Sequence, residues 1–207
     1  MKFETLRRFD RLAVNLLCLV PAGILAVMFA QGQLGPNPIQ ILERRTGDIA
    51  LALLLISLSF TPIRVITGFN RGVKYRRITG LYAFYYAAAH FLVYLGLDYG
   101  FDFALVWQTI LQTRYLWFGG VALLILTTMA ITSTDGWKLR LRRNWRRIHR
   151  LVYLASLLAL IHFALAKKGD LLHLSGEELF PFLGLVVWAV LMIVRLPPVR
   201  KLVSRQK

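Results

Sequence analysis

Long apolar runs without a charged side chain set the strongest limit on how this chain can fold. Three of them extend for 19 or 20 residues: Leu12–Ala30, Ile78–Leu97 and Tyr115–Thr134. A helix of about 20 apolar residues crosses the ~30 Å hydrocarbon core of a bilayer, with a lower limit near 17. Three shorter runs of 15 or 16 residues reach that length only with flanking residues that snorkel to the interface. We therefore predict an all-α membrane protein, a single domain over residues 1–207, with six transmembrane helices at about 12–30, 46–63, 78–97, 115–134, 149–166 and 179–195.

A seventh apolar stretch, Phe103–Thr113, contains only 11 residues. This length is typical of an interfacial or re-entrant helix rather than of a span. We expect it to lie on the outer surface, in the loop between the third and fourth spans.

The positive charge of the chain is distributed as in an inner-membrane protein. There are 26 Lys and Arg residues against 10 Asp and Glu, which gives a net charge of +16. A nucleic-acid-binding protein would carry such charge on folded, half-polar elements, whereas here it lies between the apolar runs. With both termini in the cytoplasm, 21 of the 26 basic residues lie on the cytoplasmic side, as the positive-inside rule prefers. We predict a multi-pass inner-membrane protein that contacts lipid and no nucleic acid.

Two of the four histidines lie inside predicted spans, where ionisable side chains are costly and mark function. His90 follows Arg77 by 13 residues, and His162 follows His149 by 13. At ~1.5 Å per residue, both rings lie roughly 20 Å from the cytoplasmic boundary of outward-running helices. Two neutral imidazoles at one depth suit the two axial positions of a haem iron, and filling both favours electron transfer over oxygen chemistry. The pattern predicts a b-type haem between His90 and His162 near the outer face; the alternative is that each ring only hydrogen-bonds a neighbouring helix.

His149 and the pair Arg76-Arg77 lie at the cytoplasmic ends of the fifth and third predicted spans. His149 is either a ligand of a second, inner haem or an interfacial residue near lipid phosphate. Arg76 and Arg77 either bind haem propionates, a flavin phosphate or a quinone headgroup, or act as positive-inside anchors. His173, in an outer loop, matches no other histidine in depth and is assigned no role.

Several short motifs follow one another in a characteristic order along nearly the whole chain. The most specific is Trp145-Arg146-Arg147-Ile148-His149-Arg150-Leu151-Val152-Tyr153, followed by His162. The others are Leu34-Gly35-Pro36-Asn37-Pro38, Thr46-Gly47, Thr61-Pro62, Arg76-Arg77 with Gly80-Leu81 ahead of His90, and Thr132-Ser133-Thr134. In order and spacing the chain resembles the MsrQ family (formerly YedZ) of the ferric-reductase-like transmembrane superfamily.

This resemblance implies a haem-binding subunit in a bacterial inner membrane that takes electrons from the quinone pool. It would give them to MsrP, a soluble periplasmic molybdopterin enzyme that reduces methionine sulfoxide in oxidised envelope proteins. The resemblance also implies that His90, His149 and His162 bind one b haem or two, and that FMN is a further cofactor. Sulfoxide reduction then occurs on the partner, and no catalytic residue is assigned to this chain. The missing histidine near Arg77 departs from the two-haem pattern of the superfamily.

Three other classes of protein fit parts of the pattern. A transporter or proton relay would use the histidines as titrating groups, but it would also need carboxylates in the spans, where we find only Asp48 at a helix end. A stand-alone ferric or cupric reductase would need a nicotinamide-binding domain, and the chain has no GxGxxG or P-loop pattern. A structural membrane anchor would bind no haem. For the electron-transfer hypothesis, we expect the outer loops to dock the partner: Gln31–Arg45, Asp98–Arg114 and Lys167–Glu178.

Overall fold

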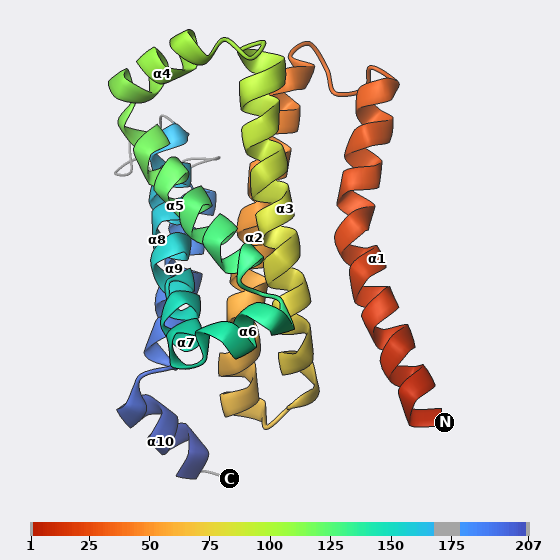
Figure 1. The fold of residues 1–207 in the computed structure, drawn as a ribbon, viewed down its shortest axis with the longest axis vertical. Coiled ribbons are helices and arrows are strands. Elements are labelled where there is room, and N and C mark those ends of the chain that lie inside the picture. The colour runs from red at the N-terminus through yellow and green to blue at the C-terminus, as the bar shows by residue number, and fades with distance from the viewer. Residues whose placement is uncertain (1, 168–178, 206–207) are drawn as a thin grey trace. The chain divides into compact units, whose positions relative to one another are not determined.

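The structure, a computed structural model, describes residues 2–167 and 179–205 as helices joined by short turns (Figure 1). The α-helices of this part are α1 Lys2–Ala30, α2 Pro38–Thr67, α3 Arg76–Leu92, α4 Phe103–Gln112, α5 Arg114–Ile131, α6 Asp135–Leu141, α7 Arg143–Arg150, α8 Val152–Ala166, α9 Leu179–Ile193 and α10 Pro197–Arg205. A 3₁₀ turn, η1 Arg71–Tyr75, precedes α3, and a π-helical turn, η2 Val93–Asp98, extends it. No strand occurs among the described residues, and the all-α prediction is confirmed.

Five helical segments are long and apolar enough to cross a membrane: Phe9–Ala30, Pro38–Thr67, Arg71–Asp98, Arg114–Ile131 and Arg143–Ala166. Large apolar side chains are exposed along them, such as Leu17 at 70% and Leu124 at 68%. Extensive exposed apolar surface of this kind marks a protein that lies in a membrane. The sixth predicted span coincides with α9, which is apolar but has only 15 residues. The prediction that this chain is a membrane protein is therefore confirmed, whereas the count of six spans stays a prediction.

Two helix boundaries on the predicted outer side show where the sequence pattern was accurate and where it was not. The short helix α4 coincides with the predicted Phe103–Thr113 to within one residue. In contrast, α2 begins at Pro38, so the prediction of a loop over Gln31–Arg45 is wrong from Pro38 onward. Proline suits the first turn of a helix because the N–H it lacks is not used there. The charged residues at 43–45 precede the apolar run, but they already belong to the helix.

The chain divides into two compact units, with α2 contributing to both. The first unit comprises Met1–Ser57 and Arg71–Phe103, and within it α1 packs against α3. The second comprises Leu58–Asn70 and Ala104–Lys207, and within it α8 packs against both α5 and α9. Each unit therefore contains one of the two histidines predicted to lie inside spans, His90 on α3 and His162 on α8.

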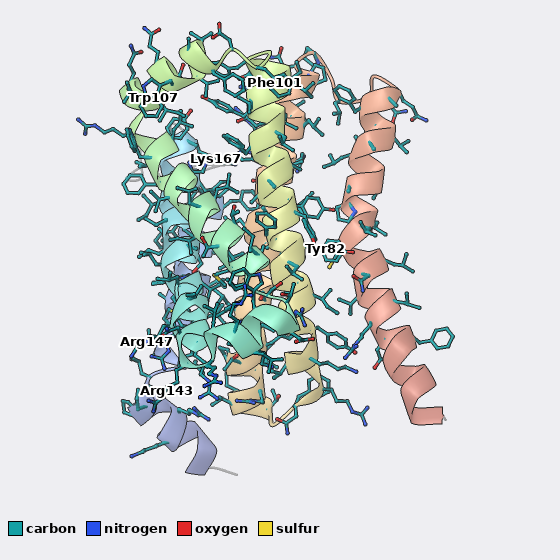
Figure 2. The ribbon with its side chains drawn as sticks, in the orientation of Figure 1. Tyr82, Phe101, Trp107, Arg143, Arg147 and Lys167 are labelled. Atoms are coloured by element: carbon teal, nitrogen blue, oxygen red, sulfur yellow. The ribbon has the colours of Figure 1, made fainter. Side chains whose placement is uncertain are left out.

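In the first unit, a tyrosine of α3 repairs the hydrogen bonding of α1 next to a proline. Pro21 lies inside α1, and the following residue, Ala22, donates its N–H to the hydroxyl of Tyr86 at 2.9 Å. That hydroxyl in turn donates to the carbonyl of Cys18 at 2.8 Å. In an uninterrupted helix the N–H of residue 22 would bond this same carbonyl directly. Tyr86 is 5% exposed, and Tyr82, one turn earlier, also points toward α1 (Figure 2).

We predict that Tyr86→Phe lowers the free energy of unfolding by about 1 kcal/mol, because a buried donor and acceptor of α1 lose their shared partner. Denaturant titration in detergent micelles measures this change. The matched control is Tyr85→Phe, since Tyr85 is 56% exposed and should tolerate the loss of its hydroxyl. Equal losses for the two variants would show that the bridge to α1 is not a specific stabilising contact.

In the second unit, an arginine replaces a helical donor that a proline removes. The carbonyl of Leu58 would normally accept from the N–H of residue 62, but that residue is Pro62. Arg195, two residues after the end of α9, donates a guanidinium N–H to the Leu58 carbonyl. The same guanidinium lies 4.9 Å from the centre of the Tyr153 ring on α8. Arg195 thus ties α8, the end of α9 and the proline turn of α2 together.

A double-mutant cycle tests this substitution of a side chain for a backbone donor. Arg195→Met should lower the free energy of unfolding by about 1–2 kcal/mol, because it leaves the Leu58 carbonyl without its charged donor. Pro62→Ala restores a backbone N–H for that carbonyl, so Arg195→Met should cost less in the Pro62→Ala background. Strictly additive effects would contradict the proposed link between Arg195 and Pro62.

Candidate functional site

His90 is held by two features of α2. Its Nδ1 lies 2.9 Å from the backbone carbonyl of Glu43. A carbonyl only accepts, so Nδ1 carries the proton, and in the neutral ring Nε2 carries the lone pair that binds a metal. The ring also lies against Gly47, where an added Cβ would come within 3.2 Å of Nδ1. The ring is half-buried, and its tautomer and position are both set by α2.

His162 is held in the same way by α5. Its Nδ1 lies 2.9 Å from the backbone carbonyl of Tyr115, so Nε2 again carries the lone pair. Gly119 faces the ring more closely than Gly47 faces His90, because a Cβ there would lie 2.7 Å from Nδ1 and 2.8 Å from Cε1. The Tyr115 ring packs beside the imidazole, with centroids 5.5 Å apart.

The two arrangements share their spacing along the chain as well as their contacts. In both, the accepting carbonyl lies 47 residues before the histidine, and the glycine is one helical turn after that carbonyl. Each unit therefore contains its own version of one device, built from a helix pair. A hydrogen bond from the second ring nitrogen to a carbonyl is what orients histidines that ligate metals and makes them more basic ligands. Both histidines consequently fit the role of haem-iron ligands through Nε2.

His149 is held differently from these two histidines. It lies in α7, and its Nε2 is 3.3 Å from the hydroxyl of Thr132, the C-terminal cap of α5. Its ring stacks on Trp145 with centroids 4.1 Å apart, and the Trp145 indole N–H donates to the Thr132 carbonyl at 2.9 Å. The nitrogen that contacts Thr132 is thus Nε2. Whether His149 is a haem ligand or an interfacial residue stays a prediction.

Arg76 and Arg77 occupy the first turn of α3. The side chain of Arg76 is half-buried and that of Arg77 is exposed. The Arg76 carbonyl accepts a hydrogen bond from the Ser57 hydroxyl at 2.9 Å, which fixes the start of α3 against α2. Their proposed roles as partners of a propionate, phosphate or quinone, or as anchors, stay predictions. His173 lies outside the described residues, as does most of the loop Lys167–Glu178.

Sequence patterns do not identify the residues that hold the histidines as site residues. Gly47 and Thr132 belong to short motifs that give no sign of a contact with a histidine, and Gly119 belongs to none of these motifs. The carbonyls of Glu43 and Tyr115 carry no side-chain signal. The equal spacing of 47 residues is a usable signal only once the contacts are known.

Comparison with known proteins supports the same family as the motifs. A family model described as ferric reductase like transmembrane component matches residues 46–160, which is more than half of the chain. A relative from Rhodospirillum rubrum, named protein-methionine-sulfoxide reductase heme-binding subunit MsrQ, is 40% identical over 192 residues, covering 92% of this chain and 89% of the relative. This chain belongs to the MsrQ family. A protein of the same name from Xanthomonas axonopodis pv. citri is 41% identical, over 84% of this chain and 84% of its own length. Another from Xanthomonas oryzae pv. oryzae is 42% identical, over 76% of this chain and 75% of its own length.

The relatives in the MsrQ family are named as heme-binding subunits, so substitution of the two glycines can be read out as a change in bound haem. We predict that Gly119→Ala greatly reduces the haem bound per protein, because the new Cβ would lie 2.7 Å from Nδ1 of His162 and must displace the ring. Gly47→Ala should have a smaller effect, since its Cβ would lie 3.2 Å from His90. Gly120→Ala is the control, because no atom lies within 4 Å of its added Cβ. Haem quantification on purified protein gives the ranking, and haem loss in the Gly120 variant equal to that in the Gly119 variant would contradict it.

Proposed function

We propose that this chain is the b-type haem membrane subunit of a methionine sulfoxide reductase system, carrying electrons from the quinone pool to a periplasmic MsrP-like molybdopterin enzyme. The observation that carries the proposal is the pair of membrane-embedded histidines whose Nδ1 atoms each donate to a backbone carbonyl. The names of the relatives, heme-binding subunits of protein-methionine-sulfoxide reductase, support the haem and the partner system. Five apolar helices long enough to cross a bilayer support the location in a membrane, which we propose is a bacterial inner membrane with both termini in the cytoplasm.

We propose that His90 and His162 would hold the haem iron through their Nε2 atoms. The carbonyls of Glu43 and Tyr115 keep a proton on Nδ1 and orient both rings, so that Nε2 is the nitrogen that would face the iron. When bound, the haem supplies one-electron transfer between its ferric and ferrous states. With two imidazoles as its protein ligands, a bound haem would favour electron transfer over oxygen binding.

On the cytoplasmic side we propose that electrons enter near Arg76, Arg77 and His149, from a quinone or from FMN. The guanidinium groups suit planar, bidentate anions such as a carboxylate or a phosphate. FMN is proposed from family resemblance alone. His149 would either ligate a second haem, in which case the protein binds two, or lie at the lipid interface, in which case it binds one.

On the outer side we propose that the partner enzyme docks beside α4 and the turns that flank it. In α4 the large apolar side chains Phe103, Leu105, Trp107 and Leu111 are 48–67% exposed. The segment Gln31–Asn37 before α2 is the part of the first predicted docking loop that is not helical. Sulfoxide reduction would take place on that partner.

The ligand assignment is tested by reduced-minus-oxidised difference spectra of purified protein. We predict that His90→Ala and His162→Ala each abolish the low-spin b-type haem signal, because the iron loses one of its two axial imidazoles. His173→Ala, outside the predicted spans, should retain the signal at the wild-type level. An unchanged signal in either span variant would overturn the assignment of that histidine, and a wild-type protein purified without pigment would overturn the haem function itself.

A further inference from the structure

The helix α7 separates its charges from its other side chains. At 100° per residue, Arg143, Arg146, Arg147 and Arg150 fall on one face of the helix, and we call these four residues the arginine face. All four are exposed. The opposite face carries Trp145, Ile148 and His149, which are half-buried. Figure 2 labels Arg143 and Arg147, which are one turn apart on α7.

Contacts on the opposite face place α7 at the end of a membrane-spanning helix. Trp145 and His149 both bond Thr132, the residue that caps α5. After Leu151, α7 is followed directly by α8, which belongs to the same spanning segment. The arginine face therefore lies where two spanning helices end, at the level of lipid headgroups.

Among the described residues, no salt bridge involves the arginine face, and Asp135 at the start of α6 is the acidic residue nearest to it in the sequence. The ion pair found among the described residues joins Lys74 to Asp10, both in the first unit. The neighbouring helix α6 adds further positive charge, with Lys138 and Arg140 exposed and Arg140 lying 5.3 Å from the Trp137 ring. A shallow cavity of about 320 Å³ beside α6 is lined by Thr134, Gly136, Trp137 and Arg140.

The backbone between the two helices directs α7 away from the line of α6. Arg142 has φ 45° and ψ −113°, in a region that residues with a Cβ rarely adopt. Such a conformation persists only when the surrounding contacts hold it. The bonds of Trp145 and His149 to Thr132 hold α7 against the end of α5.

We propose that the arginine face of α7 is a binding site for the phosphate groups of anionic phospholipid in the cytoplasmic leaflet. Guanidinium groups form paired hydrogen bonds with phosphodiester oxygens, and at headgroup depth those oxygens are the nearest ligands. Zwitterionic lipid brings no net charge, whereas four clustered arginines attract lipid with a net negative charge. The proposal does not depend on haem binding. A bound lipid would hold α7 at one depth and, through Trp145 and Thr132, would also hold His149.

Native mass spectrometry on the full chain, purified in mild detergent with equal amounts of phosphatidylglycerol and phosphatidylcholine, tests the site. The wild-type protein should retain phosphatidylglycerol in preference to phosphatidylcholine. Arg143→Gln with Arg147→Gln should weaken retention of phosphatidylglycerol by at least about tenfold, from the known attraction of each basic residue to an anionic surface. Arg143→Lys with Arg147→Lys keeps the charge and should retain most of the lipid.

The matched control removes the same charge elsewhere on the predicted cytoplasmic side, with Arg71→Gln and Arg200→Gln, both exposed residues. The control should retain phosphatidylglycerol at the wild-type level. Equal loss in the control would overturn the site, since the attraction would then follow total charge only. Complete displacement of the lipid by millimolar inorganic phosphate would overturn the lipid as occupant. Absence of any preference in the wild type would overturn the proposal and leave the face to an acidic protein partner.

Discussion

Inside a bilayer no water is present to hydrogen-bond a polar group, so every polar atom depends on a partner within the protein. This constraint explains why both membrane-embedded histidines direct Nδ1 at a backbone carbonyl. The bond satisfies the ring, and it also sets the tautomer that a metal ligand needs. Structure and proposed function therefore depend on the same contact. The glycine beside each ring serves this contact, because a Cβ at Gly119 would displace the imidazole of His162 and one at Gly47 would crowd that of His90.

The same constraint governs the two prolines inside spanning helices. At Pro62 the missing backbone donor is replaced by the guanidinium of Arg195, which donates to the Leu58 carbonyl. Next to Pro21 the hydroxyl of Tyr86 is inserted between the N–H of Ala22 and the carbonyl of Cys18, so both groups of the disturbed turn keep a partner. Tyr86 lies one turn before His90 on α3, so the repair of α1 also restrains the helix that carries a proposed ligand.

Much of the fold was predictable because the energetic cost of charge in lipid leaves a direct mark on the sequence. The uncharged runs located the long helices, and the short run at Phe103 located α4. The same criterion misplaced the start of α2, where Glu43 and its neighbours are charged but helical. Charge indicates where the apolar core of the bilayer ends, whereas a helix continues for as long as its backbone bonds are satisfied. The two limits coincide in some helices and not in others.

The sequence by itself determined that this chain is an all-α membrane protein, and its motifs indicated the family before any contact was known. Both conclusions rest on local properties: apolar length, the distribution of charge, and the order of short motifs. Only the tertiary structure decided which atoms hold each histidine. The partners are a backbone carbonyl 47 residues before each ring and a glycine one helical turn after that carbonyl. It also separated His149, held at Nε2 by Thr132, from the two histidines held at Nδ1. A carbonyl looks the same at every position of a sequence, and only the packing of one helix against another selects the one that accepts the bond.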